Sequence, residues 1–274
     1  MMSQSIDFEY IKKLIWDRSA IVLEQDKMYL IESRLMPIAR KESLVDLNEL
    51  INRLKKEPSS SPLHRTVIEA MTTNETSFFR DIHPFESLRT EVFPQLVAKR
   101  AADKKLCVWC CASSTGQELY TIGMVVKEHF PALKDWKVTI MGTDINKTVL
   151  ERTRQGTYSQ LEVNRGLPAP LLLKYFQRNG LEYQAKEDLR KLMDLREMNL
   201  AAEWPALPPA DVIFLRNVLI YFDVETKKKI LTRVKRVLRP DGFLFLGGAE
   251  TTMNLDDGFE RVQLGKASCY RIKR

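Results

Sequence analysis

The stretch Asp211-Val-Ile-Phe-Leu-Arg-Asn-Val-Leu-Ile-Tyr-Phe-Asp223 combines an apolar run of strand length with an abrupt polar break. Arg216 and Asn217 interrupt the run, and burying a guanidinium and an amide without partners would be costly. The simplest explanation is that a strand ends here, which places both residues at the carboxyl edge of a sheet. Open α/β sheets bind their ligands at that edge. An ordinary buried Arg–Asp pair explains the segment, taken alone, about as well.

Strand-like and helix-like runs alternate on both sides of this stretch, from Lys105 onward. Such alternation is typical of a doubly wound, mostly parallel sheet with helices on both faces. Two further short runs around Gly265-Lys266 predict a closing antiparallel hairpin. The expected elements are strand 106–112, helix 116–129, strand 137–143, helix 146–154, strand 210–216, helix 224–238, strand 242–247 and hairpin strands 259–263 and 268–273.

Two parts of the chain do not follow this alternation. Residues 1–82 repeat apolar side chains at three- and four-residue steps, which predicts an all-helical N-terminal domain, and residues 83–104 predict a linker helix. The α/β domain is then expected at 105–274. Residues 157–197 predict an insertion with a small antiparallel element, because Asn179-Gly180 between short runs is a hairpin signal.

Composition and charge restrict the class of protein. The 274 residues are 44% hydrophobic and 29% charged, which is typical of a soluble globular protein. No apolar run approaches the roughly 18 residues needed to span a membrane, and the start lacks the features of a signal peptide. We therefore expect a cytoplasmic protein without membrane insertion.

The net charge of +7 is unevenly distributed. Residues 1–100 contain 15 basic and 15 acidic side chains, so the whole excess lies in residues 101–274 and much of it on the helix expected at 224–238. A solvated helix face is the favoured explanation. A surface for an acidic partner or for nucleic acid is the alternative.

The cysteines and histidines do not indicate a metal site. Cys107, Cys110 and Cys111 lie in an apolar strand, where Cys110 points away from the other two, so the three thiols do not converge. Buried, reduced cysteines that act as small apolar side chains are the better interpretation. The three histidines are scattered, and we expect no metal.

The loop after the first strand and the acid after the second indicate a nucleoside site. Ser113-Ser-Thr-Gly-Gln-Glu118 has small residues that let a ligand approach the backbone, but it lacks the G-x-G-x-x-G of dinucleotide sites. Asp144 ends the second strand, where an acid can bind both ribose hydroxyls. This combination favours S-adenosylmethionine over NAD. A capped turn and a turn aspartate are the simpler alternatives.

Five segments occur in the order and at the spacing of a known family: Thr73-Asn-Glu-Thr-Ser-Phe-Phe-Arg80, Ser114-Thr-Gly-Gln-Glu118, Gly142-Thr-Asp144, Met198-Asn-Leu200 and Leu215-Arg-Asn-Val-Leu-Ile-Tyr221. Together they resemble the bacterial chemotaxis receptor methyltransferases, the CheR family of S-adenosylmethionine-dependent protein-glutamate O-methyltransferases. The resemblance covers nearly the whole chain. It implies that 105–274 is the S-adenosylmethionine-binding methyltransferase domain, that S-adenosylhomocysteine is the product, and that a monomer modifies receptors during sensory adaptation.

Matched position by position, the resemblance also implies individual roles. Arg80 and Tyr221 match the positions that matter for catalysis. The implied cofactor contacts are Asn74, Thr76, Arg80, Glu118, Asp144, Asn199, Leu200, Arg216 and Asn217. Gln117 departs from the family, which often has an acid there. The loop around 177–183 looks shorter than in members that bind a receptor's tethering pentapeptide, which implies a pentapeptide-independent enzyme.

The resemblance suggests a simple mechanism and a receptor-facing surface. A glutamate acceptor has an ordinary pKa of about 4.3 and is already ionised near neutral pH, so no general base is required. A helix of the N-terminal domain is expected to contact the receptor's helical bundle. The candidate contacts are Arg34, Arg40, Lys41, Arg53, Lys55 and Lys56.

Two other functions remain open at this point. A nucleic-acid amino-methyltransferase often has an Asn/Asp-Pro-Pro-aromatic motif where this chain has Arg216-Asn-Val-Leu, so we expect no nucleic-acid substrate. A non-catalytic S-adenosylmethionine-binding adaptor that docks on receptors is the second alternative. The presence of both Arg80 and Tyr221 argues against it.

Overall fold

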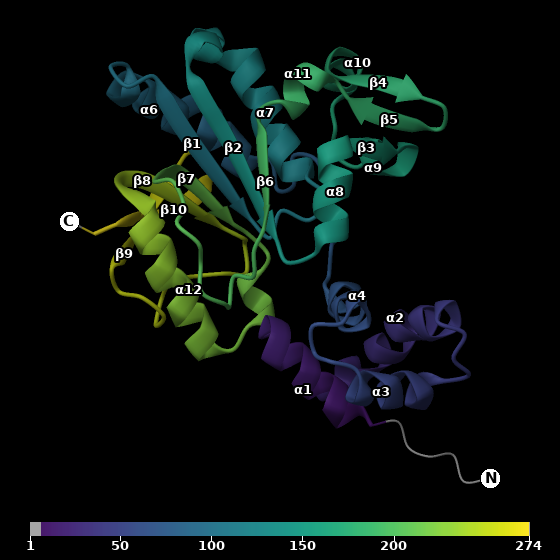
Figure 1. The fold of residues 1–274 in the computed structure, drawn as a ribbon. Helices are drawn as coiled ribbons and strands as arrows, with labels where there is room; N and C mark the ends of the chain where they lie inside the picture. The colour runs from purple at the N-terminus through teal and green to yellow at the C-terminus, as the bar shows by residue number, and fades with distance from the viewer. Residues whose placement is uncertain (1–6, 274) are drawn as a thin grey trace. The chain divides into compact units, whose positions relative to one another are not determined.

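The computed structural model describes residues 7–273 and divides into two compact units. The helical unit joins the residues up to Thr73 with the segment Tyr221–Thr226, and the α/β unit contains Asn74–Ile220 and the residues from Lys227 onward. Figure 1 labels most of the helices and strands of both units. Among residues 7–273, no helix combines the length and the apolar character that crossing a membrane requires.

The helical unit forms around one apolar core. Ile11, Ile15, Ile31 and Leu50 are fully buried in it, because apolar residues three or four apart share one face of a helix. Polar caps fix where helices begin; the side chain of Asp46, for example, accepts the backbone N–H of Glu49 at 2.9 Å. The elements are α1 (Phe8–Ser19), η1 (Gln25–Lys27), α2 (Met28–Lys41), α3 (Leu47–Lys56) and α4 (Pro62–Met71).

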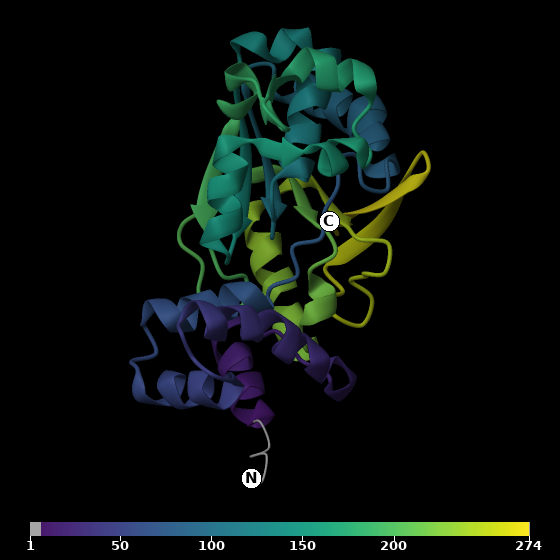
Figure 2. The same ribbon diagram turned by 90° about the vertical axis from the view of Figure 1, so that its right-hand side faces the viewer.

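The α/β unit is organised by a seven-stranded sheet with the order β6-β2-β1-β7-β8-β10-β9. The first five strands are parallel, and the predicted closing hairpin adds β10, which is antiparallel both to β8 and to its hairpin partner β9. Figure 2 shows this hairpin in yellow at the end of the sheet. The strands are β1 (Lys105–Cys111), β2 (Lys137–Asp144), β6 (Met193–Glu197), β7 (Ala210–Leu215), β8 (Leu238–Leu246), β9 (Phe259–Leu264) and β10 (Ala267–Ile272).

Helices cover the sheet. On one face, Val108 of β1 and Phe214 of β7 are buried in a core together with Leu96 of α6 and Ile122 of α7. The helices and helical turns are α5 (His83–Ser87), η2 (Leu88–Val92), α6 (Phe93–Arg100), α7 (Gln117–His129), η3 (Pro131–Asp135), α8 (Lys147–Gln155), α9 (Gln160–Asn164), α10 (Ala169–Tyr175), α11 (Glu187–Arg190), η4 (Leu219–Tyr221) and α12 (Val224–Val237). This is the doubly wound architecture expected from the alternation of strands and helices.

The inserted segment contains the expected small antiparallel sheet, with the order β3-β5-β4. Its strands are β3 (Thr157–Ser159), β4 (Phe176–Asn179) and β5 (Glu182–Ala185), and Gly180 takes a positive φ of 61° in the turn between β4 and β5. Figure 1 shows it beside α10 and apart from the main sheet.

The insertion is shorter than the sequence suggested. Residues 193–197, which we assigned to it, form β6, and β6 pairs in parallel with β2 at the edge of the main sheet. The sequence Met-Asp-Leu-Arg-Glu has no continuous apolar run, because an edge strand is only half buried. Met193 and Leu195 pack against the core, whereas Asp194 and Arg196 form an ion pair at 2.7 Å.

Candidate functional site

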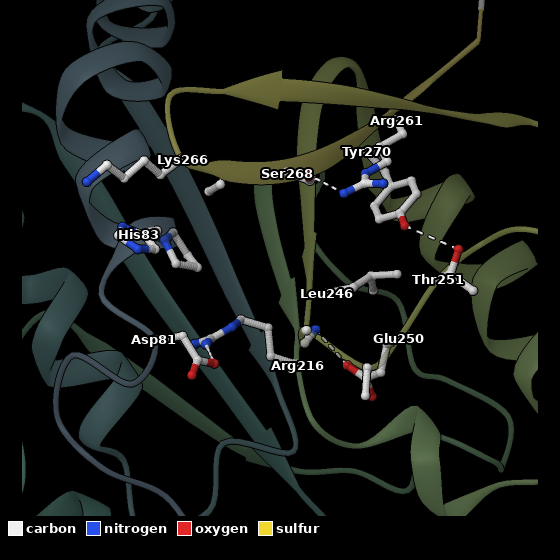
Figure 3. Close-up of a pocket in the computed structure, with 15 residues that line it drawn as sticks. Asp81, His83, Arg216, Leu246, Glu250, Thr251, Arg261, Lys266, Ser268 and Tyr270 are labelled. Atoms are coloured by element: carbon white, nitrogen blue, oxygen red, sulfur yellow. Dashed lines mark hydrogen bonds and ion pairs between the residues drawn. The ribbon is translucent and has the colours of Figure 1, made fainter.

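Arg216 directly follows β7, and its side chain is only 2% exposed. Its terminal nitrogens donate to Glu118 Oε2 at 2.7 Å, to Asp81 Oδ2 at 2.7 Å and to the backbone oxygen of Arg80 at 2.9 Å. Two carboxylates and a carbonyl therefore compensate a guanidinium that has lost its water. Figure 3 shows Arg216 facing Asp81. This contact joins three of the sequence motifs at the carboxyl edge of the sheet.

Asp144 ends β2 at the same edge and is buried. Its carboxylate accepts the backbone N–H of Ser114 at 2.8 Å and of Asn146 at 2.9 Å, and its backbone oxygen accepts the N–H of Met198 at 2.9 Å. The Ser114 hydroxyl in turn donates to the backbone oxygen of Asn74 at 2.8 Å. Hydrogen bonds to the side chain or backbone of Asp144, or through Ser114, thus connect four of the five sequence motifs.

The polar segment before α5 has an unusual backbone. Phe79, Asp81 and Ile82 have positive φ angles of 49°, 63° and 30°, a region that side-chain-bearing residues seldom adopt. Phe78 anchors the segment in the core, where its ring meets Tyr158 edge-to-face at 5.0 Å between centroids. Such conformations persist only where the surrounding structure fixes them, and they are frequent at ligand sites.

A cavity of about 450 Å³ lies between this segment and the loop after β1. Asn74 and Thr76 line it together with Thr115, Gln117 and Thr148. These side chains offer hydroxyl and amide groups, each of which can both donate and accept hydrogen bonds. The cavity is therefore suited to a polar part of a ligand.

Asn199 and Leu200 lie in the turn after β6. The side-chain oxygen of Asn199 accepts the N–H of Ala201 at 2.9 Å, and the backbone oxygen of Leu200 accepts Nε1–H of Trp204 at 3.0 Å. Trp204 meets Trp109 edge-to-face at 5.1 Å between centroids. These contacts fix the turn next to Met198, whose N–H is bonded to Asp144.

Glu250 is a site residue that the sequence analysis missed. One carboxylate oxygen accepts the backbone N–H of Asn217 and of Gly247, and the other accepts those of Val218 and Leu219, all at 2.7–2.8 Å. Charge-assisted bonds of this length are among the stronger ones in proteins. Glu250 therefore holds residues 217–219, called here the Asn217 segment, in place. Gly-Gly-Ala-Glu after a strand was the available signal, but it reads as an ordinary turn.

The two predicted catalytic residues, Arg80 and Tyr221, are placed differently from the other predicted site residues. The guanidinium of Arg80 donates to the backbone oxygen of Glu75 at 3.0 Å, so Arg80 meets Arg216 only through its own backbone oxygen. Tyr221 belongs to the helical unit, where its backbone oxygen accepts the N–H of Val22 at 2.9 Å. Asn217 is held at φ 58° by the Glu250 contact.

The strand cysteines are buried free thiols, as the sequence indicated. Burial raises the pKa of Cys110 and Cys111 well above the ordinary value, and the negative charge of Glu118 adds to the effect. Both thiols therefore stay protonated and unreactive at neutral pH. No cluster of three or more potential metal ligands occurs among residues 7–273.

The donor set fits S-adenosylmethionine better than a dinucleotide. A buried acid at the end of β2 suits a ribose, and the carboxylate of Glu118 is a group that can accept hydrogen bonds from an ammonium group. Gly116 opens α7 with φ 90°, and no second glycine follows in the loop to admit a pyrophosphate. The edge of the sheet is thus equipped for an adenosyl group with an amino-acid tail.

Comparison with known proteins agrees with this site. The family model described as "CheR methyltransferase, SAM binding domain" matches residues 74–267, and "CheR methyltransferase, all-alpha domain" matches residues 6–72. Chemotaxis protein methyltransferase 1 of Pseudomonas aeruginosa is 36% identical, and chemotaxis protein methyltransferase Cher2 of Pseudomonas putida 35% identical, over 100% of both chains. A chemotaxis protein methyltransferase of Vibrio parahaemolyticus is 35% identical over 97% of this chain and 98% of its own.

Proposed function

Because this chain belongs to the CheR methyltransferase family, we propose that it methylates glutamate side chains of chemotaxis receptors, forming methyl esters and S-adenosylhomocysteine. The main support is the convergence of motif residues at one sheet edge, where Arg216 bonds Glu118 and the Arg80 backbone, and Asp144 bonds the Ser114 loop. We place the reaction in the cytoplasm, on the receptors' helical bundle, and expect the enzyme to act as a monomer without nucleic acid.

Within the site we assign Asp144 to the ribose hydroxyls and the turn containing Asn199 and Leu200 to the adenine. We assign the polar tail of the cofactor to residues in or near the strained segment 74–82 and to residues near Arg216. These are Asn74, Thr76, Arg80, Glu118, Arg216 and Asn217. The support is that Asn74 and Thr76 line one polar cavity, while the buried Arg216 after β7 is paired with the partly buried Glu118 of α7.

S-adenosylmethionine supplies a methyl group that is bonded to a positively charged sulfur. The acceptor carboxylate is already ionised near neutral pH, so the protein does not need to remove a proton. The protein's main task is to align the reacting groups, which can lower the activation barrier by on the order of 7–11 kcal/mol. Arg80 suits this task because a guanidinium can hold a carboxylate through two parallel hydrogen bonds.

Tyr221 lies two residues after Leu219, the last residue of the Asn217 segment whose N–H Glu250 accepts, and we assign its hydroxyl to orienting the acceptor. Tyr221→Phe removes only that hydroxyl, so we expect a lower turnover number with little change in cofactor affinity. Steady-state kinetics and calorimetry measure the two quantities separately. Unchanged turnover in the variant removes Tyr221 from the mechanism.

The set of candidate receptor contacts can be reduced from six basic residues to three. Of the six basic candidates, Arg34 donates to the backbone oxygen of Met71, Arg53 pairs with Glu42 and Glu57, and Lys55 pairs with Asp7. These bonds indicate that Arg34, Arg53 and Lys55 stabilise the helical unit itself. The exposed Arg40, Lys41 and Lys56 are therefore the better receptor contacts. Reversing their charges should weaken receptor methylation and spare cofactor binding, whereas loss of both indicates misfolding.

The hairpin of the insertion is short, with four residues in each of β4 and β5. We accordingly propose that methylation does not depend on a receptor C-terminal pentapeptide. Deleting the last five residues of a receptor should leave its methylation rate unchanged. A large drop in rate argues for tethering.

The proposed function is tested by transfer of radiolabel from S-adenosylmethionine to receptor-containing membranes. Wild type, Asp144→Ala and Arg80→Ala are compared, with cofactor affinity measured by calorimetry. Base-labile label in receptors that is lost in both variants supports a carboxyl methyltransferase. Cofactor binding without any label, over a panel of receptors, favours a non-catalytic adaptor. Label in nucleic acid instead of receptors favours a nucleic-acid methyltransferase.

A further inference from the structure

A separate cavity of about 460 Å³ lies beside Arg216, between the loop after β8 and the β9–β10 hairpin (Figure 3). Arg216 and Glu250 form part of its wall, so it adjoins the segment that follows β7. The hairpin contributes Arg261, Lys266 and Tyr270. Of the residues in its wall the mechanism above uses Arg216, whereas Arg261, Lys266 and Tyr270 have no role in it.

The charge of the cavity is positive after existing pairs are counted. Asp81 is paired with Arg216, and the carboxylate of Glu250 is surrounded by four N–H groups. Arg261 and Lys266 are exposed, and within residues 7–273 neither forms an ion pair; Arg261 only donates to the Ser268 hydroxyl at 2.7 Å. Two cations are therefore left for a ligand.

The strand register shows which face of the β9–β10 hairpin lines the cavity. Arg261 pairs with Tyr270 and Gln263 with Ser268, and directly opposed residues of an antiparallel pair share one face. Arg261, Ser268 and Tyr270 all line the cavity, so that face turns a guanidinium and two hydroxyls toward it. Figure 3 shows Arg261 above Tyr270 on one side and Lys266 above His83 on the other.

We propose that this cavity is a specificity subsite for an acidic side chain of the polypeptide substrate, adjacent to the carboxylate that is methylated. The proposal rests on the proposed function. Arg261 can bind a carboxylate through two hydrogen bonds, and Lys266 adds a second charge. The volume suits a side chain and some backbone but not a whole helix. Arg216 and Glu250 line this wall, Arg216 directly precedes Asn217, and Glu250 accepts the backbone N–H of Asn217, so the same contacts hold the subsite wall and the residues after β7.

The test compares two double variants that lose equal charge. Arg261→Gln with Lys266→Gln removes both cavity cations, whereas Lys229→Gln with Lys273→Gln removes two exposed lysines that do not line the cavity. Receptor methylation is measured against receptor concentration at saturating S-adenosylmethionine. We expect the cavity variant to raise the KM for receptor at least fivefold, with kcat and cofactor affinity within twofold of wild type. The control should stay within twofold throughout.

A charge-conserving pair, Arg261→Lys with Lys266→Arg, should recover most of the receptor affinity. Equal KM values in the cavity and control variants overturn the subsite while leaving the proposed function intact. Wild type that labels no receptor overturns both. A free small anion is the remaining occupant: if wild type binds inorganic phosphate or free glutamate by calorimetry and the cavity variant does not, with receptor KM unchanged, the cavity is an anion site and the subsite is rejected.

Discussion

The carboxylate of Glu250 accepts the backbone N–H of Asn217 at 2.7 Å, and the same carboxylate also bonds Gly247, Val218 and Leu219. Glu250→Gln replaces one oxygen by an NH₂ group, which sets a donor against two N–H groups. We expect the free energy of unfolding to fall by about 2–3 kcal/mol. We also expect kcat to fall more than tenfold, because the Asn217 segment is no longer held.

Urea unfolding and steady-state methylation measure these two effects. Glu260→Gln is a suitable control, because Glu260 is exposed on β9 and does not line the cavity beside Arg216. If Glu250→Gln loses stability but keeps full kcat, the carboxylate supports the fold without positioning the site.

The sheet and its helices could be predicted because they depend on local patterns. Four apolar strands buried on both faces, such as β7 with every residue buried, read as continuous runs in the sequence. β6 could not be separated from the insertion, because its half-buried edge position leaves the polar sequence Met-Asp-Leu-Arg-Glu. Where a strand has few apolar residues, its place depends on its neighbour rather than on its own pattern.

The site was predictable where a polar residue interrupts an apolar run, as at Arg216. Its partners were not, because they come from distant segments. Arg216 does form an Arg–Asp pair, but its acidic partners are Asp81 and Glu118. Asp211, at the start of the same stretch, pairs with Arg100 at 2.8 Å instead. Glu250 was missed for the same reason, because its four partners are backbone groups that no side-chain pattern marks.

Removing the buried guanidinium should be strongly destabilising. Arg216→Met leaves Glu118 with its side chain only 15% exposed and without its partner. Breaking a buried ion pair on one side typically costs about 3–5 kcal/mol. Adding Glu118→Gln to Arg216→Met should recover part of this loss, since the unpaired charge is then gone.

Urea unfolding of the single and double variants measures this coupling. Lys13→Met is the control, because Lys13 and Asp17 form an exposed pair that should contribute less than about 1 kcal/mol. A loss of the same size in Arg216→Met and Lys13→Met contradicts the argument that burial makes the Arg216 pair special.

Gly166 packs closely against the strained segment 74–82. It has φ 91°, and a Cβ at this position would lie 2.1 Å from the backbone oxygen of Phe78. Gly166→Ala should therefore displace the segment that contains Asn74 and Thr76, lowering stability by more than about 2 kcal/mol. S-adenosylmethionine affinity should fall at least tenfold.

Gly180→Ala provides a matched comparison, because Gly180 also has a positive φ of 61° but no atom lies within 4 Å of the added Cβ. It should lose only the roughly 1–2 kcal/mol of a left-handed alanine and keep its cofactor affinity. Calorimetry on both variants decides the point. Equal affinities would show that the contact between residue 166 and Phe78 does not affect cofactor binding.

Burial of the strand thiols gives a pH dependence with a defined sign. Burial raises the pKa of Cys107 from 9.0 to about 11, with the charge of Asp211 as the next cause. Between these values the unfolded thiol loses its proton while the folded one keeps it, so the unfolded state binds fewer protons. The contribution to stability is therefore complete below about pH 9 and is lost as the pH rises toward 11.

Cys107→Ala isolates this contribution from other groups that titrate in alkali. Its stability difference from wild type should stay constant between pH 7 and 8.5. Above pH 9 wild type should lose its advantage by up to about 1.4 kcal/mol per pH unit. Urea unfolding across pH 7–11 measures the difference. A difference that stays constant to pH 11 would mean that the folded protein does not shield the Cys107 thiol.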